Sequence, residues 1–171
     1  MLNTLERLAD ALGAVTSALA RLTLVGVAAC LILQVVLRYV FNASLPWPEE
    51  AARYLMIWTV MLAGSLLVKD EQLVRVDFFD HFWPHRALSI RNAVFRLLLA
   101  GLLFVLVWKG WDNAVFGQRR TAVTIGISFF WIYLAVPVGG ALMMFHMIVL
   151  AIRDLVRGTP QTGPSILNAE V

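Results

Sequence analysis

The three histidines are the residues of this chain with the clearest capacity for metal or haem chemistry. His81 and His85 are four residues apart, which would place both side chains on one face of a helix. However, Pro84 lies between them and no carboxylate motif accompanies the pair. His146 is the only histidine within a long apolar segment, whereas bis-histidine haem ligation needs two at matched depth. We therefore expect no metal and no cofactor in this chain, and we interpret His146 as the partner in a hydrogen bond between helices.

Residues suited to catalysis or transport are equally sparse. No serine or cysteine has a base at a spacing typical of nucleophilic catalysis, so we expect no enzymatic activity and no catalytic residues. The polar residues deep within the apolar segments are Gln34, Thr59, Ser65 and His146, and no carboxylate is among them. A pathway for an ion or a substrate usually presents ionisable groups at this depth. The sequence therefore disfavours a chain that carries cargo by itself.

The most distinctive polar segment is 38–54, which lies between two apolar segments. Within it, Pro46 and Pro48 predict a stiff turn, and Pro48 suits the first turn of a helix. Glu49 and Glu50 follow directly, where a carboxylate interacts favourably with the helix dipole by about 0.3–1 kcal/mol. We therefore predict that this segment turns the chain at the membrane surface and starts a second helix.

The same surface is expected to hold charge pairs and aromatic anchors. Glu49 or Glu50 can reach Arg53 one helical turn on. Arg38 lies close across the connection, so we predict a cluster of ion pairs at the interface. Tryptophan and tyrosine in the stretch are typical of the aromatic belt of membrane proteins. The candidate residues for a subunit interface or an outer rim are Arg38, Trp47, Glu49, Glu50, Arg53, Tyr54, Trp58, Arg119 and Arg120.

Long apolar segments must position these residues. Between Thr121 and Ile152 no side chain is charged, and a helix over 127–152 would be about 39 Å long at roughly 1.5 Å per residue. The hydrocarbon core of a bilayer is about 30 Å thick, so such a helix crosses it with some tilt. The whole chain is 60% hydrophobic and 15% charged, with a mean hydropathy of +0.78. Spans are predicted at about 20–41, 51–68, 90–111 and 127–152.

These patterns predict an all-α membrane protein with four transmembrane helices and short connections. Residues 1–20 are expected to form an amphipathic or continuous helical lead-in, 21–157 the four-helix transmembrane domain, and 158–171 a disordered tail. The N-terminal segment carries Glu6 and Asp10, lacks a basic start and runs directly into a full span. We therefore interpret it as an uncleaved segment.

The distribution of lysine and arginine predicts the orientation in the membrane. Nine of them lie on the side of the termini and the second connection, and five lie on the other side. The positive-inside rule therefore places both termini in the cytoplasm. Interfacial arginines also account for the pI near 9.5, so no nucleic-acid partner is implied.

A proline and several glycines mark candidate packing positions. The sequence at 136–140, Val-Pro-Val-Gly-Gly, predicts a kink in the last span that serves packing rather than a substrate hinge. Gly26, Gly64 and Gly139 allow close approach of helix backbones. The sequence leaves open whether that approach is to this chain's own helices or to a partner.

The order of several short motifs resembles a known family. The motifs are Arg38-Tyr39 with Phe41-Asn42, Trp47-x-Glu49-Glu50, Ala52-Arg53-Tyr54-Leu55 with Trp58, Gly64, Val74-Arg75-Val76-Asp77, and Ile132-Tyr133-Leu134-Ala135-Val136-Pro137-Val138-Gly139. This order resembles the small membrane subunit of tripartite ATP-independent periplasmic (TRAP) transporters, the DctQ-like family. The resemblance covers most of the chain from about residue 20 to 155.

The resemblance implies an accessory small permease subunit in a bacterial inner membrane. Such a subunit pairs with a large multi-span permease subunit and braces it. A periplasmic substrate-binding protein delivers an organic acid, and the large subunit moves it with an ion gradient, commonly sodium. The resemblance therefore implies a hetero-complex for secondary transport by symport, in which the ion and substrate sites lie outside this chain.

Two other functions stay open from the residues. One is a self-sufficient small transporter that assembles as an oligomer, which the missing ionisable residue at mid-depth disfavours. The other is a membrane-anchor or cytochrome-like subunit of an electron-transfer complex, which the single histidine within the spans disfavours.

Overall fold

Four long helices and one short helix make up the part of the chain that the structure describes. The computed structural model describes residues 2–43, 45–70 and 85–157, with side chains for 5–43, 45–70 and 91–156. The helices are α1 (Leu2–Tyr39), α2 (Trp47–Lys69), α3 (His85–Gly117), α4 (Phe129–Tyr133) and α5 (Ala135–Arg157).

Four stretches are long and apolar enough to cross a membrane. They lie in α1, α2, α3 and the combined α4–α5 unit, so the prediction of an all-α protein with four spanning helices is confirmed for the described residues. The lead-in at the N-terminus is a continuous part of α1, which has 38 residues and is about 57 Å long at roughly 1.5 Å per residue. That length exceeds the hydrocarbon thickness of about 30 Å, so α1 extends beyond the span.

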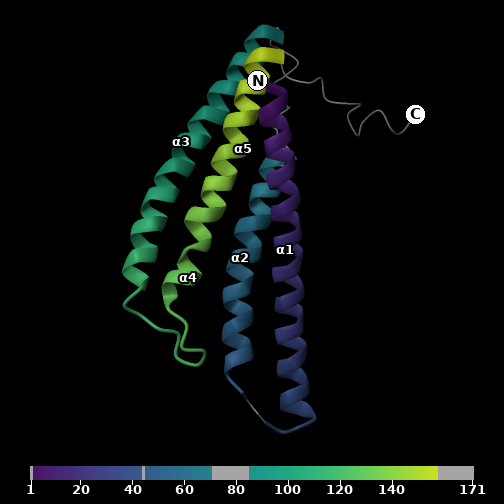
Figure 1. Ribbon diagram of the computed structural model, residues 1–171, viewed down its shortest axis with the longest axis vertical. Helices are drawn as coiled ribbons and strands as arrows, with labels where there is room; N and C mark the ends of the chain where they lie inside the picture. The colour runs from purple at the N-terminus through teal and green to yellow at the C-terminus, as the bar shows by residue number, and fades with distance from the viewer. Residues whose placement is uncertain (1, 44, 71–84, 158–171) are drawn as a thin grey trace, which may run out of the picture.

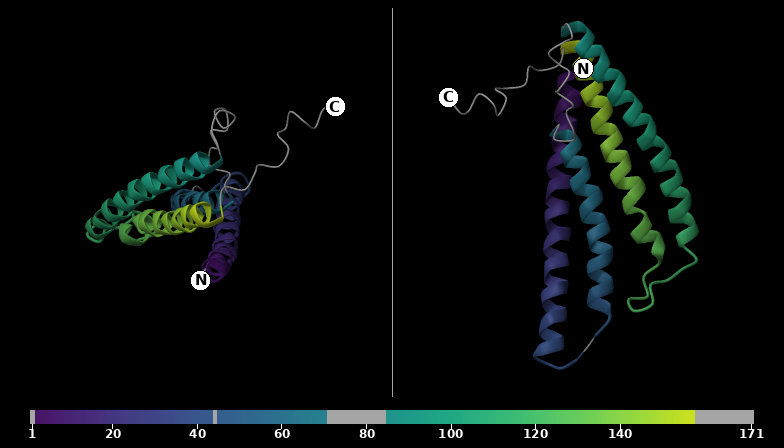
Figure 2. Two further views of the ribbon diagram at one scale, coloured as in Figure 1. Left: turned by 90° about the horizontal axis from the view of Figure 1, so that it is seen from above. Right: turned by 180° about the vertical axis from the view of Figure 1, so that it is seen from behind.

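The helices form two pairs. α1 packs on α2 and α3 packs on α5, and the contact between α2 and α5 joins the pairs. The start of α1 and the end of α5 lie at one end of the molecule, and the α1–α2 and α3–α4 connections lie at the other (Figure 1). The view from behind shows the same arrangement (Figure 2). The connections that carry the predicted rim residues therefore share one end.

Small and hydroxyl-bearing residues join neighbouring helices at membrane depth, both within the first pair and between the two pairs. The Thr59 hydroxyl of α2 donates to the Thr23 hydroxyl of α1 over 2.9 Å. A Cβ added at Gly139 of α5 would lie 2.7 Å from the Cβ of Met61 and 3.0 Å from its carbonyl oxygen. Because water is absent at this depth, helix association depends on such close packing and hydrogen bonds. Gly139 therefore serves contact within the chain, which was one of the two alternatives left open.

The fourth span contains a break. α4 ends at Tyr133 and α5 begins at Ala135. Pro137 has no amide hydrogen for the carbonyl of residue 133, and its ring crowds that carbonyl. The backbone path continues, since the Leu134 amide donates to Phe130 and the Val138 amide donates to Leu134. The proline therefore places the change in helix geometry one turn upstream of itself.

A buried ion pair joins α3 to α5 at the end where α1 starts. Arg96 Nε lies 3.1 Å from Asp154 Oδ2, and the Asp154 side chain has an exposed fraction of 0%. Arg153 Nη2 lies 3.9 Å from the other oxygen of the same carboxylate. A buried carboxylate requires such compensation, because its transfer out of water costs several kcal/mol.

Within the ranges that the structure describes, the predicted hydrogen bond from His146 to another helix is not formed by Nε2 of its ring. The side chain is buried in α5, but Nε2 has no hydrogen-bond partner among the described residues. Other predictions fall outside the described residues: the tail at 158–171, the Val74–Asp77 motif and His81. The side chain of His85 is also outside them.

Candidate functional site

The connection between α1 and α2 folds back sharply at Asn42. This residue has a φ of 50°, in the left-handed region that asparagine adopts more readily than most residues. The Val40 amide donates to Val36 over 2.9 Å, and the Ala43 amide donates to Leu37 over 3.0 Å. These bonds satisfy carbonyl groups at the end of α1 and direct the chain toward α2.

The start of α2 follows from its prolines. Pro46 is the N-cap, with φ −79° and ψ −21°, and the helix begins at Trp47. Pro48 lies in the first turn, where its missing amide hydrogen costs nothing, and it is buried. Glu49 and Glu50 also lie in the first turn, next to the positive end of the helix dipole.

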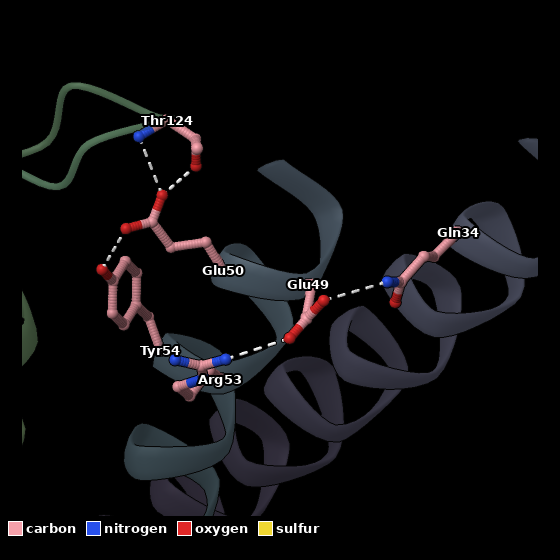
Figure 3. Close-up of polar contacts among 6 residues, drawn as sticks. All are labelled: Gln34, Glu49, Glu50, Arg53, Tyr54 and Thr124. Atoms are coloured by element: carbon pink, nitrogen blue, oxygen red, sulfur yellow. Dashed lines mark hydrogen bonds and ion pairs between the residues drawn. The ribbon is translucent and has the colours of Figure 1, made fainter. Parts of the chain in front are cut away.

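Glu49 links α2 to α1. One carboxylate oxygen lies 3.1 Å from Arg53 Nη2, one helical turn on, and the other accepts from Gln34 Nε2 over 3.3 Å (Figure 3). The side chains of Arg53 and Glu49 are 68% and 58% exposed, so the pair alone contributes little to stability. Its effect is to fix the position of the carboxylate against α1.

Glu50 links α2 to the connection between α3 and α4. Oε1 accepts from the Tyr54 hydroxyl over 2.5 Å, and Oε2 accepts from the Thr124 amide over 2.9 Å. The Thr124 hydroxyl donates to the same oxygen (Figure 3). A carboxylate that accepts several hydrogen bonds holds its donors more firmly than a neutral acceptor does. One side chain therefore ties together two segments that are 74 residues apart.

The loop that presents Thr124 is held by backbone hydrogen bonds. Thr121 and Ser128 form an isolated antiparallel bridge. The Ala122 amide donates to the Ile127 carbonyl over 2.8 Å. Gly126 has a φ of 73°, which glycine adopts without steric cost, and this allows the chain to reverse. Ser128 then caps α4 by accepting from the Phe130 amide over 3.3 Å.

Aromatic side chains continue the contact between α2 and α4 below the polar residues. The rings of Tyr54 and Phe129 meet edge to face with centroids 5.9 Å apart. The Trp58 indole donates to the Trp131 carbonyl over 3.2 Å. Such pairs add about 0.5–1.5 kcal/mol beyond the area they bury. Two of the predicted aromatic residues therefore help to hold α4 against α2.

Comparison with known proteins identifies the family. The model for "Tripartite ATP-independent periplasmic transporters, DctQ component" matches residues 27–157. The chain belongs to the DctQ family. Its DctQ segment includes α2 to α5 and residues 27–39 of α1, and the members of this family are transporter components rather than enzymes.

Relatives of this DctQ chain include both large and small permease proteins. The sialic acid TRAP transporter permease protein SiaT of Haemophilus influenzae is 33% identical over 69% of this chain, which spans 19% of that protein. The sialic acid TRAP transporter small permease protein SiaQ of Vibrio cholerae is 30% identical over 67% of this chain and 66% of its own length. The isethionate TRAP transporter permease protein DctMQ of Oleidesulfovibrio alaskensis is 25% identical over 62% of this chain, which spans 17% of that protein.

The other predicted rim residues of the DctQ chain are exposed. Trp47 is 39% exposed at the first residue of α2. The Arg38 guanidinium lies 5.9 Å from the centroid of the Tyr39 ring, and Glu49 pairs with Arg53 instead. The Arg120 guanidinium lies 5.1 Å from the centroid of the Phe116 ring. Arg119 is exposed in the turn that follows α3.

Sequence reasoning missed two residues of this site, Gln34 and Thr124. The sequence places Gln34 deep within the first span, whereas its side-chain amide donates to Glu49 at the start of α2. Thr124 lies in a stretch with several hydroxyl-bearing residues, but nothing in their spacing points to a glutamate on another helix. No group of three or more histidine, cysteine, aspartate or glutamate residues able to hold a metal gathers in the described ranges. The polar contacts that the structure describes at this end are hydrogen bonds and an ion pair. We use the term polar rim for the residues joined by these contacts, which are Gln34, Glu49, Glu50, Arg53, Tyr54 and Thr124.

Proposed function

We propose that this DctQ chain is the accessory small permease subunit of a TRAP transporter, which pairs with a large membrane subunit and braces it. The observation that supports this most directly is the relation to SiaT, in which the matching segment is 19% of one permease protein. A segment that is part of a larger permease protein in a relative is a natural partner of the large permease unit. The family match over residues 27–157 also supports a role as a component of a TRAP transporter.

The bracing role is supported by what the polar groups of the chain do. The two glutamates of the polar rim are occupied by hydrogen bonds or ion pairs to this chain's own residues. The Arg96–Asp154 pair is likewise internal. A chain that uses its charged groups to hold its own helices suits a rigid support. A carrier would keep such groups available for an ion or a substrate.

The names of the relatives support the proposed substrate class, whereas the sodium gradient rests on the resemblance of the motifs alone. The relatives are named for sialic acid and isethionate, which are both organic acids. We propose binding-protein-dependent uptake of an organic acid, in which a periplasmic binding protein delivers the substrate. The large subunit then uses a sodium gradient to move the substrate across the membrane. In this proposal the present chain holds no cofactor and has no enzymatic activity.

The proposed location is the bacterial inner membrane with both termini in the cytoplasm. The nine-to-five distribution of lysine and arginine supports this orientation. In this orientation the polar rim faces the periplasm, where Arg38, Arg119 and Arg120 are exposed to the binding protein and the large subunit. Exposed charges of this kind steer a partner and set its register more than they add affinity.

Co-purification tests the proposed pairing. The affinity-tagged chain is expressed together with a large TRAP permease from the same organism, extracted in mild detergent, and passed over the affinity resin and a sizing column. We expect the two proteins to elute as one peak in constant ratio. An unrelated four-span protein with the same tag is the control. Separate elution of the chain, with the permease intact and folded, would contradict the proposal.

A further inference from the structure

A cavity of about 230 Å³ lies where the first turns of α1, the end of α2 and the last turns of α5 meet. This is the opposite end of the molecule from the polar rim (Figure 1). Pockets for drug-sized ligands have volumes of about 300–1,000 Å³, so this smaller cavity suits a small polar group. Its lining residues are Glu6, Ala9, Asp10, Lys69, His146, Val149, Leu150 and Arg153.

The lining combines both signs of charge. Glu6 and Asp10 come from α1, and Lys69 and Arg153 come from α2 and α5. Lys69 Nζ lies 3.1 Å from Asp10 Oδ1, and the Lys69 side chain is only 25% exposed. The lysine stem packs against Gly13, where an added Cβ would lie 2.7 Å from both Cδ and Nζ. The position of this ammonium group is therefore fixed by the helix that it crosses.

His146 adds an unused polar atom to this lining. Its side chain is 1% exposed and faces the cavity from α5, yet Nε2 has no hydrogen-bond partner among the described residues. A buried polar group without a partner costs about 1–3 kcal/mol, so such groups are rare unless a ligand or water satisfies them. The imidazole therefore indicates that something polar enters the cavity.

The surroundings place the cavity at the edge of the bilayer. Leu8 and Leu12 of α1 are 52% and 39% exposed at the level of the cavity, and Leu155 of α5 is 57% exposed. Exposed apolar side chains beside charged ones are typical of the zone where a helix leaves the hydrocarbon. The molecules that are most concentrated in this zone are phospholipids.

We propose that this cavity binds the headgroup of a phospholipid that carries a primary ammonium beside its phosphate. The phosphate takes the side of Lys69, Arg153 and the His146 imidazole. The ammonium takes the side of Glu6 and Asp10, which can accept its three hydrogen bonds. An anionic headgroup without the amine would bring its negative charge next to two carboxylates and add no cation, and a trimethylated amine cannot donate a hydrogen bond to them. The inference does not depend on pairing with a permease, because all of these residues belong to this chain.

Native mass spectrometry of the purified full-length chain tests the proposal. The chain is exchanged into detergent with defined amounts of phosphatidylethanolamine, phosphatidylglycerol or phosphatidylcholine. We expect phosphatidylethanolamine to be retained at the lowest concentration. His146→Phe and Glu6→Gln should each weaken that retention about tenfold, the loss expected for one hydrogen bond to a charged group. The control is Lys109→Gln, which removes a 76% exposed cation on α3, a helix that does not line the cavity. This variant should retain phosphatidylethanolamine as well as the unaltered chain does.

The remaining measurements are folding controls and results that would contradict the proposed lipid site. Circular dichroism and a sizing column check that the variants fold, and Glu6→Gln serves if His146→Phe does not. Equal retention of the three lipids, or retention unchanged in both variants, would overturn the proposal and leave a cavity filled by water. Equally tight binding of soluble phosphoethanolamine would also overturn the assignment to a lipid.

Discussion

Glu50 is the residue on which the polar rim depends, because it joins α2 to the loop after α3. We predict that Glu50→Ala lowers the yield of complex with the large subunit and lowers transport in the same proportion. Thr124→Val should have a smaller effect in the same direction, since it keeps the backbone amide donor. The double variant should be milder than the sum of the two, because the residues are in direct contact. Co-purification yield and uptake rate are the measurements.

Lys109→Gln is the control for that experiment. The Lys109 side chain is 76% exposed, and its ion pair is with Asp112 on the same helix. We expect this change to affect the co-purification yield far less than Glu50→Ala does. If Glu50→Ala leaves assembly intact and yet abolishes transport, the structural role is wrong, and a direct role in docking or coupling takes its place.

Asp154 carries the largest single-residue effect on stability that we expect. It is fully buried and paired with Arg96, so Asp154→Ala leaves a buried cation without its main partner. We predict a loss of about 3–5 kcal/mol of unfolding free energy in detergent for the single change. The double change Arg96→Met with Asp154→Leu should recover much of that loss, because it removes both charges. A double variant less stable than Asp154→Ala would contradict this prediction.

The sequence predicted contacts between near neighbours better than contacts between distant residues. The Glu49–Arg53 pair follows from a spacing of four residues on one helix. The Glu50–Thr124 contact and the Arg96–Asp154 pair join residues far apart in the chain, and only the packing of α5 against α2 and α3 brings them together. The orphan nitrogen of His146 is equally a product of packing, since periodicity alone places the ring on a helix without naming its partners.

Close packing of α2 against α5 is the main feature at the scale of the elements. Gly139→Leu would force its side chain into the Met61 backbone, so we predict a loss of about 1–3 kcal/mol of unfolding free energy. Gly101→Leu on α3 is the control, because nothing lies within 4 Å of a Cβ built there. Thermal unfolding of the two variants in the same detergent measures the difference. Equal stability of both would show that α2 and α5 are not in close contact.

The spanning helices were predictable because an apolar segment of this length is typical of a helix that crosses a bilayer. The residues at which these helices begin and end were harder to predict. α1 starts well before its span, and α3 extends to Gly117, because polar helical turns continue beyond the apolar segment. The turn at 121–128 depends on backbone hydrogen bonds and on the positive φ of Gly126, which hydropathy does not report.

The orientation of the whole molecule gives a further prediction. In a Cys30→Ala background the chain has no other cysteine. A single cysteine introduced at Asn42 should react with a membrane-impermeant maleimide in intact spheroplasts, whereas one at Arg157 should react only after lysis. The distribution of positive charge motivates this result. The reverse pattern would place the polar rim in the cytoplasm and overturn its proposed exposure to the binding protein.

The central claim for the molecule is that it supports transport without carrying the substrate. Uptake of a labelled organic acid such as sialic acid into proteoliposomes with an inward sodium gradient and the cognate binding protein tests it most directly. Three preparations are compared: this chain alone, the large permease alone, and the two together. We predict saturable uptake only when both are present, and no uptake above empty vesicles with this chain alone. Saturable, gradient-dependent uptake by this chain alone would contradict the claim.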